Sequence, residues 1–303
     1  MPNIRQGSIH LFRFSGIDVF LHWSWFFVAA IEINNRARSY SSPVWNVLEY
    51  LALFFIVMLH EFGHALACRQ VGGTANNIVL WPLGGVAYVN PPQRPGATLW
   101  SIAAGPLVNV LLAGPLFGLV LLGRSLGWSD SAPDAMRFLI TVFVINGYLL
   151  AFNVLPIYPL DGGQILRSLL WFVLVRARSL VVASIIGFIG VPLLFLYAWW
   201  QSSVWLALLS LLIVSLCWRG LKQAQMLARV ARLPRRPGFR CPSCETAPPI
   251  GAWWTCARCG KPFDTFETQA VCPDCGMPFA GTRCLDCGEM HGMDDWRLTP
   301  PVM

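Results

Sequence analysis

Two histidines and a glutamate lie together in an otherwise apolar stretch of the chain. The segment His60-Glu61-Phe62-Gly63-His64 follows ten residues, 50–59, that are all apolar or aromatic. Because His60 and His64 are four residues apart, their imidazoles share one helical face and can bind a single Zn²⁺ ion. Glu61 is placed to take a proton from a metal-bound water. The alternative is a pair of histidines that only satisfy local hydrogen bonds, but ionisable side chains inside an apolar span are usually functional.

A third ligand for such an ion is expected at Asp161. A catalytic zinc ion needs three protein ligands and one open position for water. Asp161 follows Pro156 and Pro159 and precedes Gly162-Gly163. The prolines interrupt a helix and the glycines permit an unusual backbone, so the carboxylate can turn inward. The alternative role for Asp161 is to cap a helix that begins near Gln164.

The composition indicates a membrane protein with a smaller polar part. Of the 303 residues, 55% are hydrophobic and only 12% are charged, whereas soluble proteins carry about 25% charged residues. Residues 1–18 lack the features of a signal peptide, so we expect the first apolar segment to be retained. The fold class that follows is a mainly α, polytopic membrane protein. About six transmembrane helices are expected, at residues 20–33, 44–69, 98–122, 137–155, 180–200 and 204–218.

The depth and orientation of the histidine pair can also be estimated. His64 and His60 lie five and nine residues before Arg69, which at about 1.5 Å per residue is roughly 8–14 Å from that end of the helix. Arginines concentrate in the loops after the second, fourth and sixth spans. By the positive-inside rule, the termini and the face nearer the metal are expected to be cytoplasmic, in the cell membrane of a prokaryote.

Residues 71–95 do not fit a spanning helix. They contain Gly72-Gly73, Pro82, Gly84-Gly85 and Pro91-Pro92 around an alternating apolar piece. This pattern predicts a short membrane-embedded β-hairpin, which is tolerated where it packs on protein or lines a cavity. An exposed strand edge there can pair with an extended peptide.

Eight of the ten cysteines form four Cys-x-x-Cys pairs near the C-terminus. In a reducing cytosol these pairs indicate two structural zinc sites rather than disulfides, and a small tandem zinc ribbon. The spacing leaves open whether neighbouring pairs share an ion or the pairs interleave. Cys68 and Cys217 are expected to pack as small hydrophobes. The predicted structural zinc ligands are Cys241, Cys244, Cys256, Cys259, Cys272, Cys275, Cys284 and Cys287.

The chain therefore divides into four expected parts: a six-span core at 1–220, a basic juxtamembrane linker at 221–240, the tandem ribbon at 241–290 and a tail at 291–303. Residues 219–240 carry seven basic residues and no acidic one. We interpret this as an anchor to anionic lipid, with nucleic-acid binding as the less favoured alternative. His22 is expected to be interfacial or packed, although a role near the site stays open, and His291 is expected to be exposed.

Four segments of the sequence together resemble the site-2 protease family of zinc-dependent intramembrane proteases. They are His60–His64, the Gly84-Gly85 pair, the segment Ala104–Asn109 and the segment Asn153–Gly163. The resemblance covers about residues 8–220. It departs from many relatives, because the sequence has no insertion long enough for a PDZ domain and no room for a CBS pair.

The resemblance implies a role for each site residue. His60, His64 and Asp161 would bind a catalytic zinc ion, Glu61 would be the general base, and Asn153 would help to hold the substrate carbonyl or the oxyanion. The implied function is cleavage of a membrane-spanning segment of a client protein within the lipid bilayer, in regulated intramembrane proteolysis.

Two other classes of function are alternatives for this sequence. A catalytically silent scaffold would recruit a cytosolic protein partner through the ribbon, but it has no reason to keep an ionisable cluster in lipid. A zinc transporter would need ligands on several spans and a path open to both faces. We also hypothesise that the ribbon controls substrate entry or senses a cytosolic state.

Overall fold

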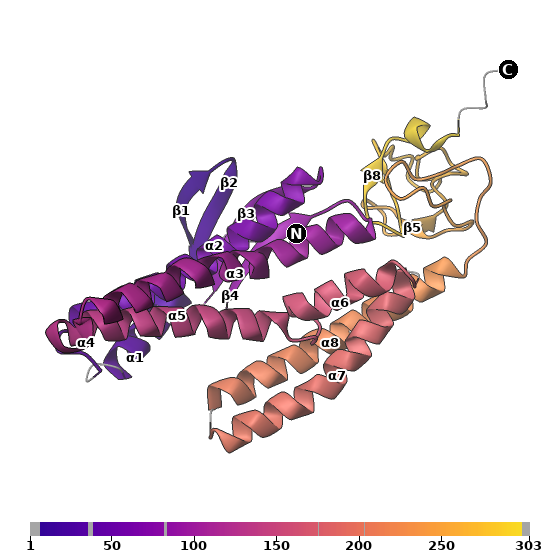
Figure 1. Cartoon of the computed structure of the whole chain (residues 1–303). Coiled ribbons are helices and arrows are strands. Elements are labelled where there is room, and N and C mark those ends of the chain that lie inside the picture. Colours follow the sequence, from indigo (N-terminus) through magenta and orange to yellow (C-terminus); the bar gives the residue numbers. More distant parts are fainter. Residues whose placement is uncertain (1–6, 36–38, 82–83, 175, 203, 299–303) are drawn as a thin grey trace. The chain divides into compact units, whose positions relative to one another are not determined.

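The computed structural model describes residues 7–35, 39–81, 84–174, 176–202 and 204–298. The chain forms two compact units (Figure 1). The helical unit comprises the chain up to residue 173 together with 182–217, and the ribbon unit comprises 174–181 and the chain from 218 onward. The helices are α1 (Ser24–Asn35), α2 (Pro43–Gln70), α3 (Pro95–Ser125), α4 (Trp128–Ser131), α5 (Pro133–Val154), α6 (Asp161–Trp171), α7 (Arg176–Trp200) and α8 (Val204–Ala231).

Proline starts three of the long helices. Pro43, Pro95 and Pro133 are the first residues of α2, α3 and α5. A proline is well suited to this position, because its fixed φ is helical and the first amide of a helix has no intrahelical partner. The side chain of Ser42 also caps α2 by accepting a hydrogen bond from the amide of Val44.

Within the described residues, four helices are long and apolar enough to cross a membrane: Pro43–Gln70, Pro95–Ser125, Pro133–Val154 and Arg178–Trp200. They coincide with the predicted second to fifth spans. The predicted first span is wrong in its first part, because Phe20 and His22 belong to a strand and α1 has only 12 residues, about 18 Å of helix. The predicted sixth span falls in α8, which is not among these four, so the count of six is not confirmed.

A four-stranded sheet packs against α2. Its order is β1 (Ser8–Phe14), β2 (Ile17–His22), β3 (Thr74–Trp81) and β4 (Gly84–Asn90). The β3–β4 pair is the predicted hairpin, although Pro82 and Leu83 at its tip lie outside the described residues. The β1–β2 hairpin was not predicted, and it pairs with β3 in parallel through β2.

The inner strands bury the apolar side of the sheet. Ile17, Val19, Ile78 and Leu80 are fully buried and form one core with side chains of α2 such as Ala65. Because β4 is the last strand in the order, one of its edges is unpaired within the sheet, and this strand lies against α2. The sheet therefore presents a strand edge to the helix that carries the histidine pair.

The ribbon unit contains two short hairpins, β5 (Trp254–Thr255) with β6 (Pro262–Phe263) and β7 (Thr282–Arg283) with β8 (Met290–His291). Its small core includes Trp254, Phe266 and Trp296 together with cysteines. Trp296, in a 3₁₀ turn, is 1% exposed and packs edge-on to Phe266. The folded part thus continues past residue 290, where we expected a tail to begin.

Candidate active site and cysteine clusters

The side chains of His60, His64 and Asp161 converge on one point. Nε2 of His60 lies 3.0 Å from Oδ2 of Asp161. Nε2 of His64 lies 3.2 Å from the same oxygen, and the two Nε2 atoms are 3.1 Å apart. Helix α2 supplies both histidines and the first turn of α6 supplies the aspartate. The sequence-based grouping of these three residues therefore corresponds to a real cluster in the fold.

Asp161 is the first residue of α6, and the N-cap position before it is Leu160. Its carboxylate instead contacts both imidazoles. The alternative in which Asp161 only caps a helix does not match this arrangement.

The hydrogen bonds on the far side of each imidazole favour a metal ion between them. Nδ1 of His64 donates to the backbone carbonyl of Ser101 at 2.9 Å, and Nδ1 of His60 donates to Oδ1 of Asn109 at 2.6 Å. A neutral imidazole that donates through Nδ1 has only a lone pair at Nε2. In their neutral forms the two imidazoles therefore each turn a lone pair toward the carboxylate oxygen of Asp161, and a cation bound between the three atoms would satisfy all of them.

The separations also fit zinc. A tetrahedral Zn²⁺ ion with bonds of about 2.0–2.1 Å holds its ligand atoms roughly 3.3–3.4 Å apart. The three separations of 3.0, 3.1 and 3.2 Å are close to that value. Three protein ligands leave one position of a tetrahedral site for water or substrate.

Glu61 lies against the edge strand. It is 6% exposed, and its Oε2 accepts a hydrogen bond of 2.8 Å from the amide of Ala87 in β4. Gly85, two residues earlier in β4, passes so close that a Cβ atom there would lie 2.2 Å from Cγ of Glu61. The sheet thus fixes the carboxylate that adjoins the histidines.

Two asparagines extend the site into the helix bundle. Asn109 of α3 and Asn146 of α5 are both fully buried. Nδ2 of Asn109 donates to Oδ1 of Asn146, and Nδ2 of Asn146 donates to the backbone carbonyl of Asn109, each at 2.9 Å. Asn109 was part of the family resemblance, but no role was predicted for Asn146. The signal that points to it is an amide side chain in an apolar span, which rarely lacks a partner.

The remaining predicted residues lie as follows. Asn153 is half-buried in the last turn of α5. His22, at the end of β2, hydrogen-bonds Ser24 and stacks on Trp81 with ring centroids 3.9 Å apart. A packed role for His22 agrees with these contacts.

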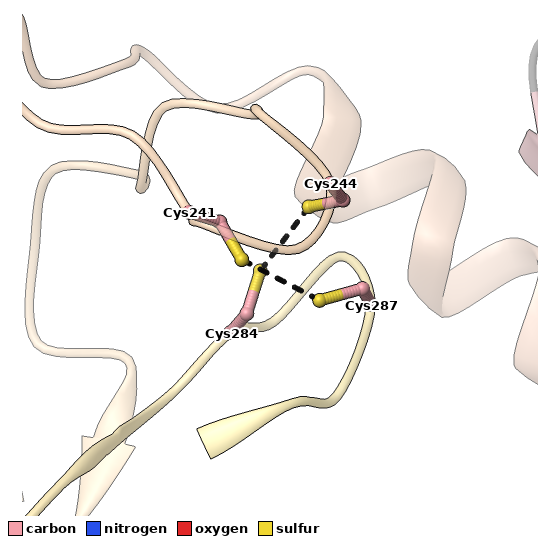
Figure 2. Close-up of side chains that lie close together, drawn as sticks. All are labelled: Cys241, Cys244, Cys284 and Cys287. Atoms are coloured by element: carbon pink, nitrogen blue, oxygen red, sulfur yellow. Dashed lines mark hydrogen bonds between the residues drawn. The ribbon is translucent and has the colours of Figure 1, made fainter. Parts of the chain in front are cut away.

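The eight C-terminal cysteines form two clusters in a nested order. The first Cys-x-x-Cys pair meets the fourth, so Cys241 lies 3.6 Å from Cys287 and Cys244 lies 3.7 Å from Cys284, measured between sulfurs (Figure 2). The second pair meets the third in the same way, with Sγ–Sγ distances of 3.6 Å. We call these the outer and the inner cluster. The spacing left two pairings open, of neighbouring pairs or of interleaved pairs, and this nested arrangement differs from both.

Both clusters suit tetrahedral zinc. Zn–S bonds of about 2.3 Å place tetrahedral sulfurs roughly 3.8 Å apart, whereas a disulfide would bring them to about 2.05 Å. In all four pairs the amide of the residue after the second cysteine donates to the carbonyl of the first cysteine. The turns are therefore alike, and the chemistry of the donor set is that of structural zinc.

Arginines contact aspartates inside the ribbon unit, and one of these aspartates, Asp286, lies between two cysteines of the outer cluster. The guanidinium of Arg235 binds both carboxylate oxygens of Asp286, at 2.6 and 3.1 Å. Arg176 donates to the backbone carbonyl of Asp286. Burial lowers the pKa of Arg176, while negative charge on the neighbouring sulfurs of Cys287 and Cys244 acts in the opposite direction. Arg236 pairs with buried Asp264, so two arginines of the basic segment serve the ribbon rather than solvent or lipid.

These features define a metallopeptidase-type site among membrane helices, accompanied by a cysteine-rich unit. Residues 49–128 and 129–197 match peptidase family M50. A zinc metalloprotease of Methanocaldococcus jannaschii is 32% identical over 206 residues, which are 68% of this chain and 58% of that protein. A protein of Synechocystis, also named as a zinc metalloprotease, is 29% identical over 61% of this chain and 49% of its own length.

A solved structure agrees with these matches. The site-2 protease from Methanocaldococcus jannaschii superposes with a TM-score of 0.51 and 28% identity, covering 71% of this chain and 95% of that one. The chain belongs to peptidase family M50, the site-2 protease family, as its sequence motifs indicated. It spans about half the length of the curated relatives it matches, and the family match ends at residue 197, before the cysteines.

Proposed function

We propose that the protein is a zinc-dependent intramembrane endopeptidase that cleaves a membrane-spanning segment of a client protein. The observation that carries the proposal is the convergence of three potential metal-ligand atoms, from His60, His64 and Asp161, with Glu61 next to His60 in the chain. Relatives named as zinc metalloproteases support the same activity. The apolar helices around the site support a substrate that lies in the lipid bilayer.

The three ligands would hold one zinc ion, which when bound supplies an activated water by lowering the pKa of that water toward neutrality. Glu61 takes the proton of the attacking water and returns it to the leaving nitrogen. The hydrogen bond from Ala87 occupies Oε2 of Glu61 and leaves Oε1 for these proton transfers. The same bond holds the carboxylate beside the ligands.

The substrate is proposed to lie along β4. The amide of Ala87 points away from β3, toward Glu61, and backbone groups of a strand alternate with a period of two. Gly85, Ala87 and Val89 therefore direct their backbone groups to the unpaired edge. An extended peptide added to that edge beside the Ala87 amide, which Glu61 already occupies, would run directly past Glu61. Asn153 would then contact the scissile carbonyl or the oxyanion, a role that rests on the family resemblance.

The cysteine clusters are proposed to hold two further zinc ions, so that the loaded chain contains three. We also propose that both termini and the ribbon unit face the cytoplasm, where a protein partner could bind the ribbon. The prediction of a lipid anchor now applies to the basic residues before Arg235, because Arg235 and Arg236 are paired with aspartates.

The test is cleavage of a panel of single-span reporter proteins by wild type and Glu61→Gln, with bound zinc counted in both. We expect cleavage only by wild type and three zinc ions in each protein. Glu49→Gln is the matched control, because Glu49 is another buried glutamate of α2 and hydrogen-bonds Tyr40 rather than the site. Equal cleavage by Glu61→Gln and Glu49→Gln would reject Glu61 as the general base. No cleavage by wild type or by Glu61→Gln, with only two zinc ions bound, would favour the silent scaffold.

A further inference from the structure

A chain of amide contacts links the imidazole of His60 to a helix that carries no ligand. Oδ1 of Asn109 accepts a hydrogen bond from Nδ1 of His60, and Nδ2 of Asn109 donates a hydrogen bond to Oδ1 of Asn146 in α5. Both asparagines are 0% exposed. A buried amide in an apolar helix interface is costly unless each of its polar atoms has a partner.

The direction of this chain is fixed at its far end. A backbone carbonyl can only accept a hydrogen bond, and Asn146 contacts the carbonyl of Asn109. Asn146 must therefore turn its Nδ2 toward that carbonyl and its Oδ1 toward the side chain of Asn109. Asn109 must then present Nδ2 to Asn146 and Oδ1 to His60.

The orientation of Asn109 determines whether Nε2 of His60 carries a proton. An acceptor opposite Nδ1 holds the proton there and leaves the lone pair of His60 at Nε2, where Asp161 and His64 converge. If Asn109 turned over, its amide protons would face Nδ1 and would favour the tautomer that carries its proton at Nε2. That tautomer cannot bind a metal ion through Nε2.

We propose that Asn146 is a positioning residue, which acts through Asn109 to hold His60 in the tautomer that binds metal. This inference rests on the proposed function, because it assigns His60 as a zinc ligand. Asn146 touches neither substrate nor metal. Its effect depends on offering one donor and one acceptor at the same time, and not on filling space between the helices.

Four variants of the full chain test this chemistry. Asn146→Leu and Asn146→Ala remove the donor and the acceptor while changing the volume in different ways. Asn146→Asp retains both groups in its protonated form, which a fully buried carboxyl group favours. Asn46→Leu is the matched control, because Asn46 lies on α2, is 3% exposed, and has no hydrogen-bond partner for its amide among the described residues.

Two measurements are made on each variant. In the first, cobalt replaces zinc and a chelator titration gives the metal affinity of the His/Asp site. The absorption of this site is distinguished from that of the thiolate clusters because it lacks sulfur-to-cobalt charge transfer. The tautomer of His60 in the metal-free chain is read from ¹⁵N chemical shifts, which is practicable because the chain has only 5 histidines.

We expect Asn146→Leu and Asn146→Ala to lower the metal affinity of the His/Asp site by about 10- to 100-fold, as loss of a partner behind a ligating histidine typically does. In both, part of the His60 signal should move to the other tautomer. Asn146→Asp and Asn46→Leu should resemble wild type. Asn146→Leu added to Asn109→Leu should cause no further loss, because Asn146 acts only through Asn109.

Wild-type affinity and tautomer in both Asn146→Leu and Asn146→Ala would overturn the proposal, as would an equal loss in Asn146→Asp. The parallel variant His60→Ala separates this result from a failure of the proposed function. If His60→Ala loses the metal while Asn146 variants keep it, the metal site stands and the positioning role is rejected. If His60→Ala keeps the metal with wild-type affinity, the site itself is rejected, and the positioning role with it.

Discussion

At the scale of single residues, the metal-facing nitrogens lie in contact with a glycine of the next helix. A Cβ atom on Gly105 of α3 would lie 2.2 Å from Nε2 of His64 and 2.8 Å from Nε2 of His60. We therefore expect Gly105→Ala to displace both imidazoles and to lower metal occupancy and cleavage by at least about tenfold, in line with disturbed ligand geometry. The measurement is bound zinc together with reporter cleavage. Gly114→Ala is the control on the same helix, since nothing lies within 4 Å of its added carbon, and a loss there equal to that at Gly105 would contradict the argument.

A second residue-scale prediction concerns the first cysteine turn of the ribbon. Three of the four turns place glycine after the second cysteine, with φ between 67° and 85°, whereas the first places Glu245 there with φ of 58°. A non-glycine residue in this conformation is strained by about 1–2 kcal/mol. Glu245→Gly should therefore stabilise the outer cluster by about 1 kcal/mol, seen as a higher chelator concentration for half-release of its zinc. Glu267→Gly, an exposed glutamate without positive φ, should give no such gain.

At this scale the metal-binding side chains are easier to predict from the sequence than the groups that orient them. Four residues of helix are enough to place His60 and His64 on one face. The partners behind them, Ser101 and Asn109, lie 37 and 49 residues away in the chain on another helix. Only the packing of α3 against α2 brings them together, and no local spacing encodes that packing. Asn153 stays a prediction from the family resemblance.

At the scale of elements, the nested order of the cysteine pairs predicts how many zinc ions two variants lose. Pairing of neighbouring Cys-x-x-Cys pairs would predict the opposite numbers. Replacing the four outer cysteines, 241, 244, 284 and 287, by serine should remove one zinc ion and leave the inner cluster loaded, because the inner ligands are untouched. Replacing the first two pairs, 241, 244, 256 and 259, also removes four cysteines but disrupts both clusters, and should remove two. The measurement is the number of zinc ions bound per chain. If the outer-cysteine variant lost two ions and the variant of the first two pairs lost one, neighbouring pairs would share an ion instead.

The elements also show where a pattern was misread. The apolar run that begins at Phe20 was interpreted as the start of a spanning helix, but its first residues complete β2. Ser15 and Gly16 both have positive φ, at 49° and 74°, which is typical of a two-residue hairpin turn. This Ser-Gly pair, between two pieces of alternating apolar and polar residues, was the available signal for the hairpin. The β3–β4 hairpin was predicted because glycine and proline interrupt residues 71–95 too often for a helix.

At the scale of the whole molecule, the chain alternates between its two units. Helices α7 and α8 each begin or end in the ribbon unit and continue into the helical unit. In the helical unit, Val191 of α7 and Ile213 of α8 form a core with Ile157, which lies in the segment that leads to Asp161. Helices α7 and α8 are thus continuous with the ribbon unit along the chain, and their parts in the helical unit pack on the segment that leads to the third ligand.

The hypothesis that the ribbon controls substrate entry or choice can be tested on this basis without shortening the chain. The variant with all four outer cysteines replaced loses the cluster beside Arg176 and Asp286 but keeps every residue of the proposed active site. We expect it to retain the zinc held by His60, His64 and Asp161, and to cleave the reporter panel with an altered rate or altered preference among reporters. Asp286→Asn, which weakens the Arg235 pair while sparing the cysteines, should shift the panel in the same direction by a smaller amount. Normal rate and normal preference in both variants, with the outer zinc absent from the first, would show that the ribbon has no part in handling substrate and would leave it as a binding unit for a separate partner.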